Sequence, residues 1–270
     1  MKYTYDEKFF TVWSRDLAYI LGFTFADGNI YGCTLSYSLA QKDIKVLQYI
    51  RKCVKTESPV KTFRRKRKGG KKFNWVCRLR INSTKIVKIL NDKYKLTPHK
   101  TKTASIDFDI PEAFRGDFIR GFFDGDGWVY NRRKSVEAGV CGASSKFIND
   151  FHALCGHIGN FRYRKPSKHK IASYSIEFYT KSSLKLRELM YQKEPFCLER
   201  KKKRFWDFYT PSEKLWTKAQ IEYLMKHSNN NAENVAVAIQ KSVSAVLNKR
   251  FKLGLCKKRH CTKKEAPKTS

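Results

Sequence analysis

The sequence lacks any long apolar run and is poor in acidic residues. Its 270 residues include only 24 Asp and Glu against 57 Lys and Arg, so the formal net charge is +33. No apolar stretch approaches the roughly 18 residues that a membrane-spanning helix needs, and the opening residues, MKYTYDEKFF, have no apolar signal-peptide core. These absences exclude a helical membrane protein and predict a soluble, intracellular one.

Paired cysteine motifs are also absent. The eight cysteines are dispersed without a CxxC pair, so neither a zinc ribbon nor a disulfide framework is indicated. Cys256, His260 and Cys261 lie close together, but in a Lys/Arg-rich tail without a fourth ligand at a sensible spacing. We therefore expect no structural zinc site.

What the sequence has in abundance is positive charge, on a chain with enough apolar residues for a core. Hydrophobic residues make up 41% of the sequence and aromatic residues 14%, which is typical of folded domains rather than of a disordered basic tail. A surface this basic repels itself unless it meets a polyanion, and nucleic acid is the ordinary partner once a membrane is set aside. The composition predicts a folded nucleic-acid-binding protein.

An internal repeat organises most of the chain. Residues 17–30 read LAYILGFTFADGNI and residues 117–129 read DFIRGFFDGDGWV, each a helix-like apolar run with an acid and a glycine near its end. The two final acids, Asp27 and Asp126, are 99 positions apart. Alternating patterns that predict strands follow at 32–43 and 137–146, and amphipathic patterns that predict helices follow at 44–54 and 147–159.

The repeat continues through a basic hairpin and a closing helix. The hairpins cover residues 60–81 and 161–179, with Gly69-Gly70 and Pro166-Ser167 at their turns. Asn82-Ser83-Thr84 and Lys181-Ser182-Ser183 are expected to cap the closing helices. The half-unit is therefore helix, two strands, helix, two strands, helix.

Prolines indicate where one unit passes to the next. Pro111 and Pro211 fall near the ends of the two repeats. We expect a first half-domain at 1–110, a second at 111–210, and a separate unit at 211–270.

The last unit has no strand pattern and three short helical patterns. Thr217 and Ser242 are expected to cap the first and third helices, and Gly254 to stop the third. A three-helix unit with polar residues on the outer side of its last helix is typical of a helix-turn-helix reader of the major groove. The candidate reading residues are Ser244, Asn248, Lys249 and Arg250.

Two acids from two copies of one helix suit phosphodiester hydrolysis, because carboxylate-held divalent ions activate water and neutralise charge on the phosphate. If the repeated helices pack side by side, their C-terminal ends bring Asp27 and Asp126 together. Such close packing needs small residues on the shared face. Gly22, Ala26, Gly121 and Gly125 would provide them. The simpler alternative, that both acids merely precede glycine turns, leaves the repeat unexplained.

The strings ILGFTFADG (20–28) and IRGFFDGDG (119–127) resemble the two motifs of a single-chain LAGLIDADG homing endonuclease. The resemblance covers about the first 210 residues. It implies an α+β fold of two pseudo-symmetric repeats, with the motif helices at the central interface and antiparallel sheets forming a saddle over the major groove. It also implies a monomer that cuts both strands of a specific duplex site across the minor groove. The cut would leave short 3′ overhangs and promote mobility of the host intron or gene.

The same resemblance implies roles for site residues. Asp27 and Asp126 would bind two or three divalent ions, Mg²⁺ above all, with the carbonyls of Ala26 and Gly125 as further ligands. Residues that order water or stabilise charge would be Gln41, Ser144, Lys100 and Lys201. One departure is that the earlier motif acid, present as Asp124, is replaced by Phe25 in the first half, which implies a difference in packing rather than a loss of activity.

DNA contacts should come from the outward faces of the strands and from the basic hairpin tips. The expected DNA-binding residues of the two repeats are Arg64, Arg65, Lys66, Arg67, Lys71, Lys72, Arg78, Arg80, Arg132, Arg133, Arg162, Arg164, Lys168 and Lys170.

The C-terminal strings WTKAQIEYL and KSVSAVLNKRFKLGL resemble Myb/SANT-like helix-turn-helix modules, which implies DNA contacts beyond the cleavage site. A protein-interaction module is the alternative there.

For the whole chain, two other functions stay open: a non-cutting LAGLIDADG protein that acts as an intron-splicing maturase or a DNA/RNA-binding regulator, and a general basic nucleic-acid-binding protein. Both acids being present favours the endonuclease. Duplex DNA is the expected partner, with no membrane and no obligate protein partner. The expected location is the cytoplasm of a bacterial or phage-infected host, or an organelle.

Overall fold

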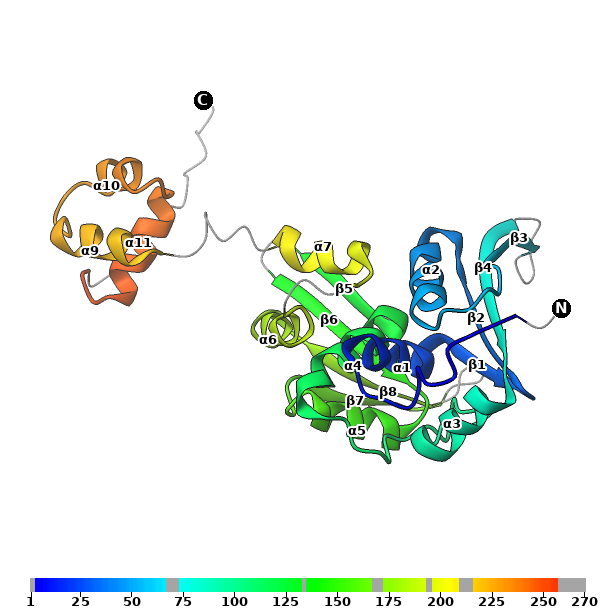
Figure 1. The fold of residues 1–270 in the computed structure, drawn as a ribbon. Helices are drawn as coiled ribbons and strands as arrows, with labels where there is room; N and C mark the ends of the chain where they lie inside the picture. Colours follow the sequence, from blue (N-terminus) through cyan, green and yellow to red (C-terminus); the bar gives the residue numbers. More distant parts are fainter. Residues whose placement is uncertain are drawn as a thin grey trace, which may run out of the picture. The chain divides into compact units, whose positions relative to one another are not determined.

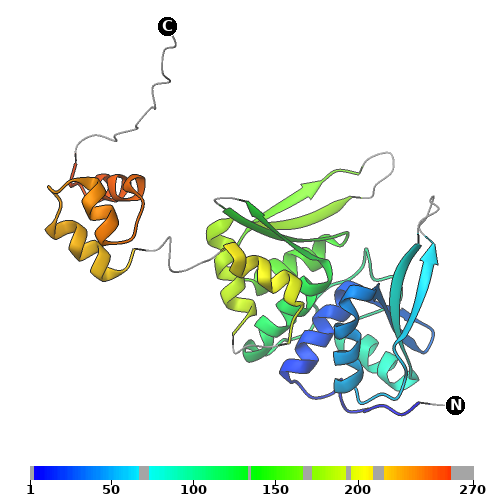
Figure 2. The same cartoon turned by 90° about the horizontal axis from the view of Figure 1, so that it is seen from above.

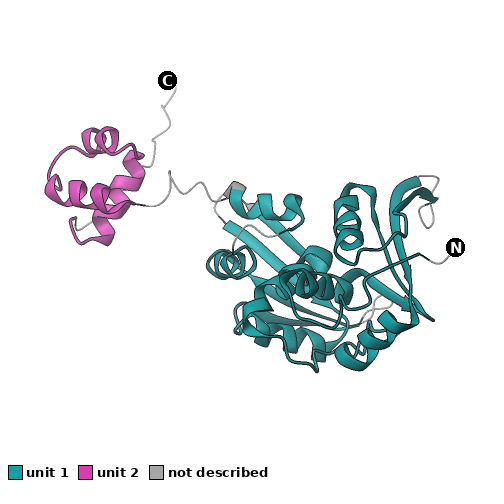
Figure 3. Cartoon of the chain, viewed as in Figure 1, with its two compact units in different colours: residues 1–208 teal, residues 209–270 magenta. Residues whose placement is uncertain are grey.

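The chain runs twice through the same order of helices and strands, as the repeat predicts (Figure 1). The computed structural model describes residues 3–66, 73–132, 135–166, 172–192, 196–208 and 216–256. It divides into two units, Met1–Phe208 and Tyr209–Ser270 (Figure 3). Both repeats belong to the first unit.

The helices and strands of the two repeats correspond one to one. In the first repeat they are α1 (Arg15–Asp27), β1 (Gly28–Tyr31), β2 (Thr34–Ala40), a short 3₁₀ turn (Gln41–Asp43), α2 (Ile44–Cys53), β3 (Lys61–Lys66), β4 (Phe73–Asn82) and α3 (Thr84–Tyr94). In the second they are α4 (Glu112–Asp126), β5 (Gly127–Arg132), β6 (Ser135–Gly142), α5 (Ser145–Leu154), β7 (Asn160–Arg164), β8 (Ser173–Phe178) and α6 (Thr180–Met190). A further helix, α7 (Glu199–Phe208), closes the unit.

Each repeat builds one antiparallel four-stranded sheet. The strand order is β1-β2-β4-β3 in the first sheet and β5-β6-β8-β7 in the second. Alternation buries one face of each sheet: Leu35 pairs with Ile81 on the core side of the first, and Val140 pairs with Ile176 on the core side of the second. The opposite faces are accessible to solvent, as expected for antiparallel sheets covered by helices on one side (Figure 2).

The two sheets share one hydrophobic core with α1 and α4 at its centre (Figure 1). Ser14 caps α1 by accepting a hydrogen bond from the backbone N–H of Leu17 (3.1 Å). Every residue of α1 from Leu17 to Phe25 is buried, because the helix is covered on all sides by its own repeat and by α4. Because α1 and α4 are apolar around most of their circumference, they are buried at the centre of the unit.

Two predicted boundaries were wrong. Helix α5 ends at Leu154 rather than near residue 159, because Gly156 and Gly159 adopt positive φ angles of 65° and 94°. Helix α6 begins at Thr180, with Tyr179 as its N-cap, so Ser182 lies inside the first turn. There its hydroxyl accepts a hydrogen bond from the Tyr179 N–H (2.8 Å) and completes a capping box.

The second unit contains the three predicted helices, α9 (Lys218–Lys226), α10 (Ala232–Ala238) and α11 (Val243–Lys252). Thr217 and Ser242 cap the first and third, as expected. Five buried residues form a small core of its own: Leu224, Val235, Ala236, Ile239 and Val246. Throughout the described parts of the chain, every helix is too short or too polar to span a bilayer.

Candidate active site and nucleic-acid face

The central helices approach each other over glycine, as the sequence predicts. A Cβ atom on Gly22 would lie 2.1 Å from the carbonyl oxygen of Phe118, and one on Gly121 would lie 2.0 Å from that of Tyr19. A Cβ on Gly125 would lie 2.3 Å from the Cβ of Ala26. Backbone atoms cannot move aside as a flexible side chain can, so a larger residue at either Gly22 or Gly121 would push the two helices apart.

This packing brings the two motif acids together. Helix α1 ends at Asp27 and α4 ends at Asp126, and in both cases the next residue is a glycine that begins a strand. The Oδ2 atom of Asp27 lies 3.2 Å from the position that a Cβ on Gly125 would occupy, so the carboxylate of the first repeat lies against the last turn of the second. Both acids keep solvent-accessible surface.

The surroundings raise the pKa of both acids. For Asp126 the pKa rises to about 6, first because the surrounding protein removes water and second because of the negative charge of Asp27. For Asp27 the pKa is raised by desolvation, with Asp43 adding to the effect and the ammonium groups of Lys201 and Lys100 opposing it. The negative charge of Asp27 thus acts on Asp126, as expected for two acids at the ends of packed helices, and a bound cation there would be stabilised.

The two lysines predicted from sequence lie at equivalent carbonyls. Lys100 Nζ donates a hydrogen bond to the carbonyl of Ala26 (3.4 Å), and Lys201 Nζ donates one to the carbonyl of Gly125 (3.1 Å). Lys201 also donates to Phe123 (2.8 Å) and Asp124 (2.7 Å), so all three of its donors bind the C-terminal turn of α4. Burial lowers the pKa of Lys201 to about 8 and also lowers that of Lys100.

The two predicted water-ordering residues differ in their surroundings. Gln41 is exposed and begins the 3₁₀ turn after β2, as a residue at a strand end should. Ser144 borders a hollow of about 90 Å³ that Asp126 and Lys100 also line. Its hydroxyl, however, caps α5 by accepting from the Phe147 N–H (3.2 Å) and donates to the Ala104 carbonyl (2.6 Å). Ser144 is therefore a helix cap, and its proton is already committed.

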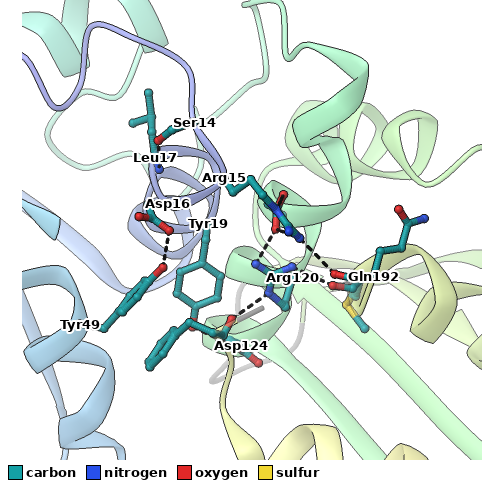
Figure 4. Close-up of polar contacts among 12 residues, drawn as sticks. Ser14, Arg15, Asp16, Leu17, Tyr19, Tyr49, Arg120, Asp124 and Gln192 are labelled. Carbon is teal, nitrogen blue, oxygen red and sulfur yellow. Dashed lines mark hydrogen bonds and ion pairs between the residues drawn. The ribbon is translucent and has the colours of Figure 1, made fainter. Parts of the chain in front are cut away.

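Asp124 occupies a buried polar position beside the site, not the site itself. Its Oδ2 accepts hydrogen bonds from the Tyr19 hydroxyl (2.9 Å) and the Leu198 N–H (2.8 Å), and burial raises its pKa to about 6. Figure 4 shows Tyr19 and Asp124 meeting between the helices. At the equivalent position Phe25 stacks on Phe108 and Phe147, with ring centroids 5.8 and 5.2 Å apart. The departure from the motif is a difference in packing, as expected.

Sequence reasoning missed two ion-pair networks that join the repeats. Arg200, on α7, binds Asp43 through both carboxylate oxygens, at 2.8 and 2.9 Å, and its charge reaches Asp27. At the other end of the central helices Asp117 accepts from Arg15 (3.1 Å) and from Arg120 (2.7 Å), a group that Figure 4 shows in part. Arg200 stands beside the predicted Lys201, but no spacing rule links it to a residue 157 positions away.

The outer face of the first sheet carries Arg78 and Arg80, opposite Ser38 and Ser36. By register, Arg65 lies on the same face. Together with Lys61, the two β4 arginines line a hollow of about 280 Å³. This surface fits the predicted contact with DNA phosphates.

For two residues of this hairpin, the prediction that they face DNA with Arg78 and Arg80 was wrong. Arg64 and Lys66 pair with Trp75 and Phe73, and alternation puts these four side chains on the other face of the hairpin. The Arg64 guanidinium lies 5.1 Å from the Phe73 ring centre and 5.9 Å from that of Trp75. Strand alternation alone would have separated these residues from Arg65 and Arg78.

In the second sheet Arg162 and Arg164 lie on the outer face, opposite Ser175 and Ser173. Both are exposed. The remaining predicted hairpin residues lie outside the described residues, or outside the described side chains in the case of Arg132: Arg67, Lys71, Lys72, Arg133, Lys168 and Lys170.

In the second unit, the prediction for Arg250 was wrong. Arg250 is buried and donates hydrogen bonds to the carbonyls of His227 (2.9 Å) and Asn230 (2.8 Å), so it fixes the loop after α9. Ser244 and Asn248 are exposed on α11, and Lys249 lies over the Trp216 ring at 5.7 Å. The polar surface of α11 is therefore smaller than predicted.

Among the described residues, no group of three or more His, Cys, Asp or Glu side chains is close enough to hold a metal ion. Any ion at the central site would be held by fewer side chains. Asp27 and Asp126 form such a pair, with the second lone pairs of the Ala26 and Gly125 carbonyls beside them. Hard oxygen donors with open positions for water and phosphate are what Mg²⁺ prefers, so the donor set fits.

Comparison with known proteins gives a match in the second repeat. Residues 113–192 match the model of the LAGLIDADG-like domain family. No curated protein matches the chain.

Several solved structures are similar to this chain. The homing endonuclease I-WcaI bound to its DNA recognition sequence has 16% identity and a TM-score of 0.46 over 74% of this chain and 91% of its own. Full-length DUF199/WhiA from Thermatoga maritima has 14% identity and a TM-score of 0.44 over 92% and 94%. I-DmoI in complex with DNA and Mn has 12% identity and a TM-score of 0.38 over 68% and 98%. The second repeat matches the LAGLIDADG-like domain family, and the first repeat has the same order of helices and strands.

Proposed function

We propose that the protein is a divalent-metal-dependent endonuclease that hydrolyses both strands of a specific duplex DNA site. The observation that carries the proposal is the meeting of Asp27 and Asp126 at the ends of two packed, repeated helices. Among the described residues, neither carboxylate accepts a hydrogen bond or forms an ion pair, although both lie where the protein raises their pKa. Two such acids without a structural partner are typical of a functional site.

Asp27 and Asp126 would hold the metal ions, with the Ala26 and Gly125 carbonyls as further donors. When bound, divalent ions lower the pKa of a water and neutralise charge on the phosphate. Lys100 makes one long hydrogen bond, so its other donors are available to a phosphate oxygen near Asp126. Lys201 is held by three carbonyls and acts by fixing the end of α4, and with it Asp126. Gln41 stays a proposal as a residue that orders water.

The finer features of the reaction follow from the same proposal. The outer sheet faces would contact the major groove on the two sides of the cut, and the second unit would add contacts as a helix-turn-helix module. Cleavage across the minor groove would leave short 3′ overhangs and serve mobility of the host intron or gene. Because both acids are on one chain, a monomer would suffice.

One observation favours a second candidate, a maturase or regulator that binds nucleic acid without cutting it. The two lysines place two positive charges beside the two carboxylates, so the site could be neutral without a metal ion. Charges balanced in this way could serve only to hold the central helices together, without any catalytic role. Cleavage is the property that separates the two candidates.

The test is cleavage of a plasmid that carries the uninterrupted insertion site of the gene. We expect linear product with Mg²⁺ and none with EDTA. Asp27→Asn and Asp126→Asn should each bind the site and fail to cut, whereas Asp92→Asn, at an exposed acid on α3, should cut as the unchanged protein does. Tight binding without cutting in either Mg²⁺ or Mn²⁺ would leave the non-cutting candidate.

A further inference from the structure

The outer faces of the two sheets differ in charge. The four strands of the first sheet contain no Asp or Glu, and the partners of Arg78 and Arg80 across the strands are serines. The second sheet carries Glu137 on β6 and Glu177 on β8. A carboxylate on a surface that binds a polyanion opposes that binding, so the contacts of Glu177 require an explanation.

Glu177 holds the two arginines of its own sheet. Its Oε2 lies 3.8 Å from Arg162 Nε, and its Oε1 lies 3.6 Å from an Nη atom of Arg164. All three side chains are on the outer face, because Glu177 and Arg162 lie two register positions apart on paired strands. The arginines are the cations predicted to contact DNA, and each is partly neutralised before DNA arrives.

The carboxylate is fixed and the arginines are not. Glu177 is only 20% exposed, and the Tyr179 hydroxyl donates a hydrogen bond to its Oε2 (3.0 Å). The side chains of Arg162 and Arg164 are 56% and 75% exposed, and both contacts are longer than a hydrogen bond. Exposed pairs of this kind contribute little free energy, so a phosphate replaces Glu177 where the DNA backbone lies directly against the arginine, as at a fitted site, and less where the backbone approaches loosely.

We propose that Glu177 masks Arg162 and Arg164 and makes the second sheet the selective one of the two DNA-binding faces. Non-specific duplex DNA would be held by the first sheet, whose four strands contain no acidic residue to compete with the phosphate. At the correct site, the Glu177 carboxylate would accept a hydrogen bond from the N4 amino group of a cytosine in the major groove, and the two arginines would then turn to phosphate or guanine. The inference rests on the proposed function only in that the outer sheet faces meet duplex DNA.

The test uses non-specific binding, so it needs no knowledge of the target. A fluorescent 30-base-pair duplex of random sequence would be titrated at several salt concentrations, and the slope of log K against log salt measured. Each phosphate contact contributes about 0.9 to the slope. Arg78→Gln and Arg80→Gln should each reduce its magnitude by about that amount. Arg162→Gln and Arg164→Gln should change it by less than about half as much in the unchanged protein, and by the full amount in a Glu177→Gln background.

Two controls make the result decisive. Glu222→Gln removes one negative charge on α9. In that background, Arg162→Gln and Arg164→Gln should change the salt slope as little as they do in the unchanged protein. Selection from a randomised duplex should enrich cytosine at one position with the unchanged protein and not with Glu177→Met, which has no oxygen to accept from the N4 amino group. Equal slope changes for Arg162→Gln with and without Glu177 would overturn the mask. An unchanged base preference in Glu177→Met would overturn the cytosine contact.

The two proposals fail separately. If the slopes follow the expectation but the unchanged protein does not cut DNA, the endonuclease proposal is wrong and the proposal for Glu177 is supported. If cutting is observed and the slopes do not depend on Glu177, the mask is wrong and the endonuclease stands.

Discussion

The two repeats carry matching glycines, acids and lysines at their shared interface, and differ in other residues around it. Glycines, acids and lysines occur in matched pairs at the centre, where each residue of one repeat meets its counterpart or the backbone beside it. Two positions before the last acid, the match breaks, with Phe25 in one repeat and Asp124 in the other. The charges of the outer sheet faces differ as well. Symmetry is thus retained in the backbone packing and the paired acids of the central helices. It is lost at Phe25 and Asp124, each of which contacts the other repeat through a different kind of partner.

The largest effect should come from breaking the part on which the repeats agree. Gly121→Val would put a branched side chain where even a Cβ lies 2.0 Å from the Tyr19 carbonyl oxygen. Because that atom is backbone, relief requires the helices to separate, at a cost of more than about 5 kcal/mol, comparable with the whole stability of a domain. Chemical denaturation of the first unit measures it.

A matched control is Gly142→Ala, where the nearest atom is a side-chain methyl of Ile148 at 3.2 Å. We expect a loss below about 1 kcal/mol there. If Gly121→Val folded as stably as Gly142→Ala, the helices would not be packed through glycine.

The next effect should come from imposing symmetry where the repeats differ. Phe25→Asp would bury a carboxylate among Phe108, Phe118 and Phe147, without the hydroxyl and N–H donors that serve Asp124. An unpaired buried charge and a lost aromatic contact together should cost about 3–5 kcal/mol. Phe25→Leu, which keeps an apolar side chain, should cost clearly less. Thermal unfolding of both variants tests this, and equal losses would mean that the charge is not buried.

The sequence predicts the repeated parts of the fold well because repetition supplies a second sample of each pattern. The order of helices and strands and the glycine interface both depended on setting one half beside the other. Lys100 and Lys201 came instead from the resemblance to a two-motif family, and they lie at equivalent carbonyls. Asp43 and Arg200, which bind each other across the repeats, have no such counterpart and were missed. Their contact is created by the fold, because α7 packs on the second repeat and places the Arg200 side chain within reach of Asp43 in the first.

Errors in single residues had local physical causes. Arg64 and Lys66 were grouped with Arg78 by charge, although strand alternation places them on the other face. Arg250 was read as an outer-side residue of α11, but two loop carbonyls needed its donors. Ser144 caps α5 and also borders the hollow beside Asp126, so its role in ordering water stays a prediction. Charge and polarity identify a residue that forms hydrogen bonds; they do not say whether its partner is the protein or a ligand.

The smallest effect sharpens the comparison between the two lysines. Lys201→Met would leave three carbonyls at the end of α4 without their donor, which should cost about 1–3 kcal/mol. Lys100→Met removes one long hydrogen bond, so its loss should be below about 1 kcal/mol. Unfolding free energies of the two variants, measured in the same denaturant, give the difference directly. Equal losses of unfolding free energy would contradict the division into a lysine fixed by the helix, Lys201, and one available to the substrate, Lys100. Because Lys100 is not held by the helix, Lys100→Met should be the variant that loses cleavage without losing stability.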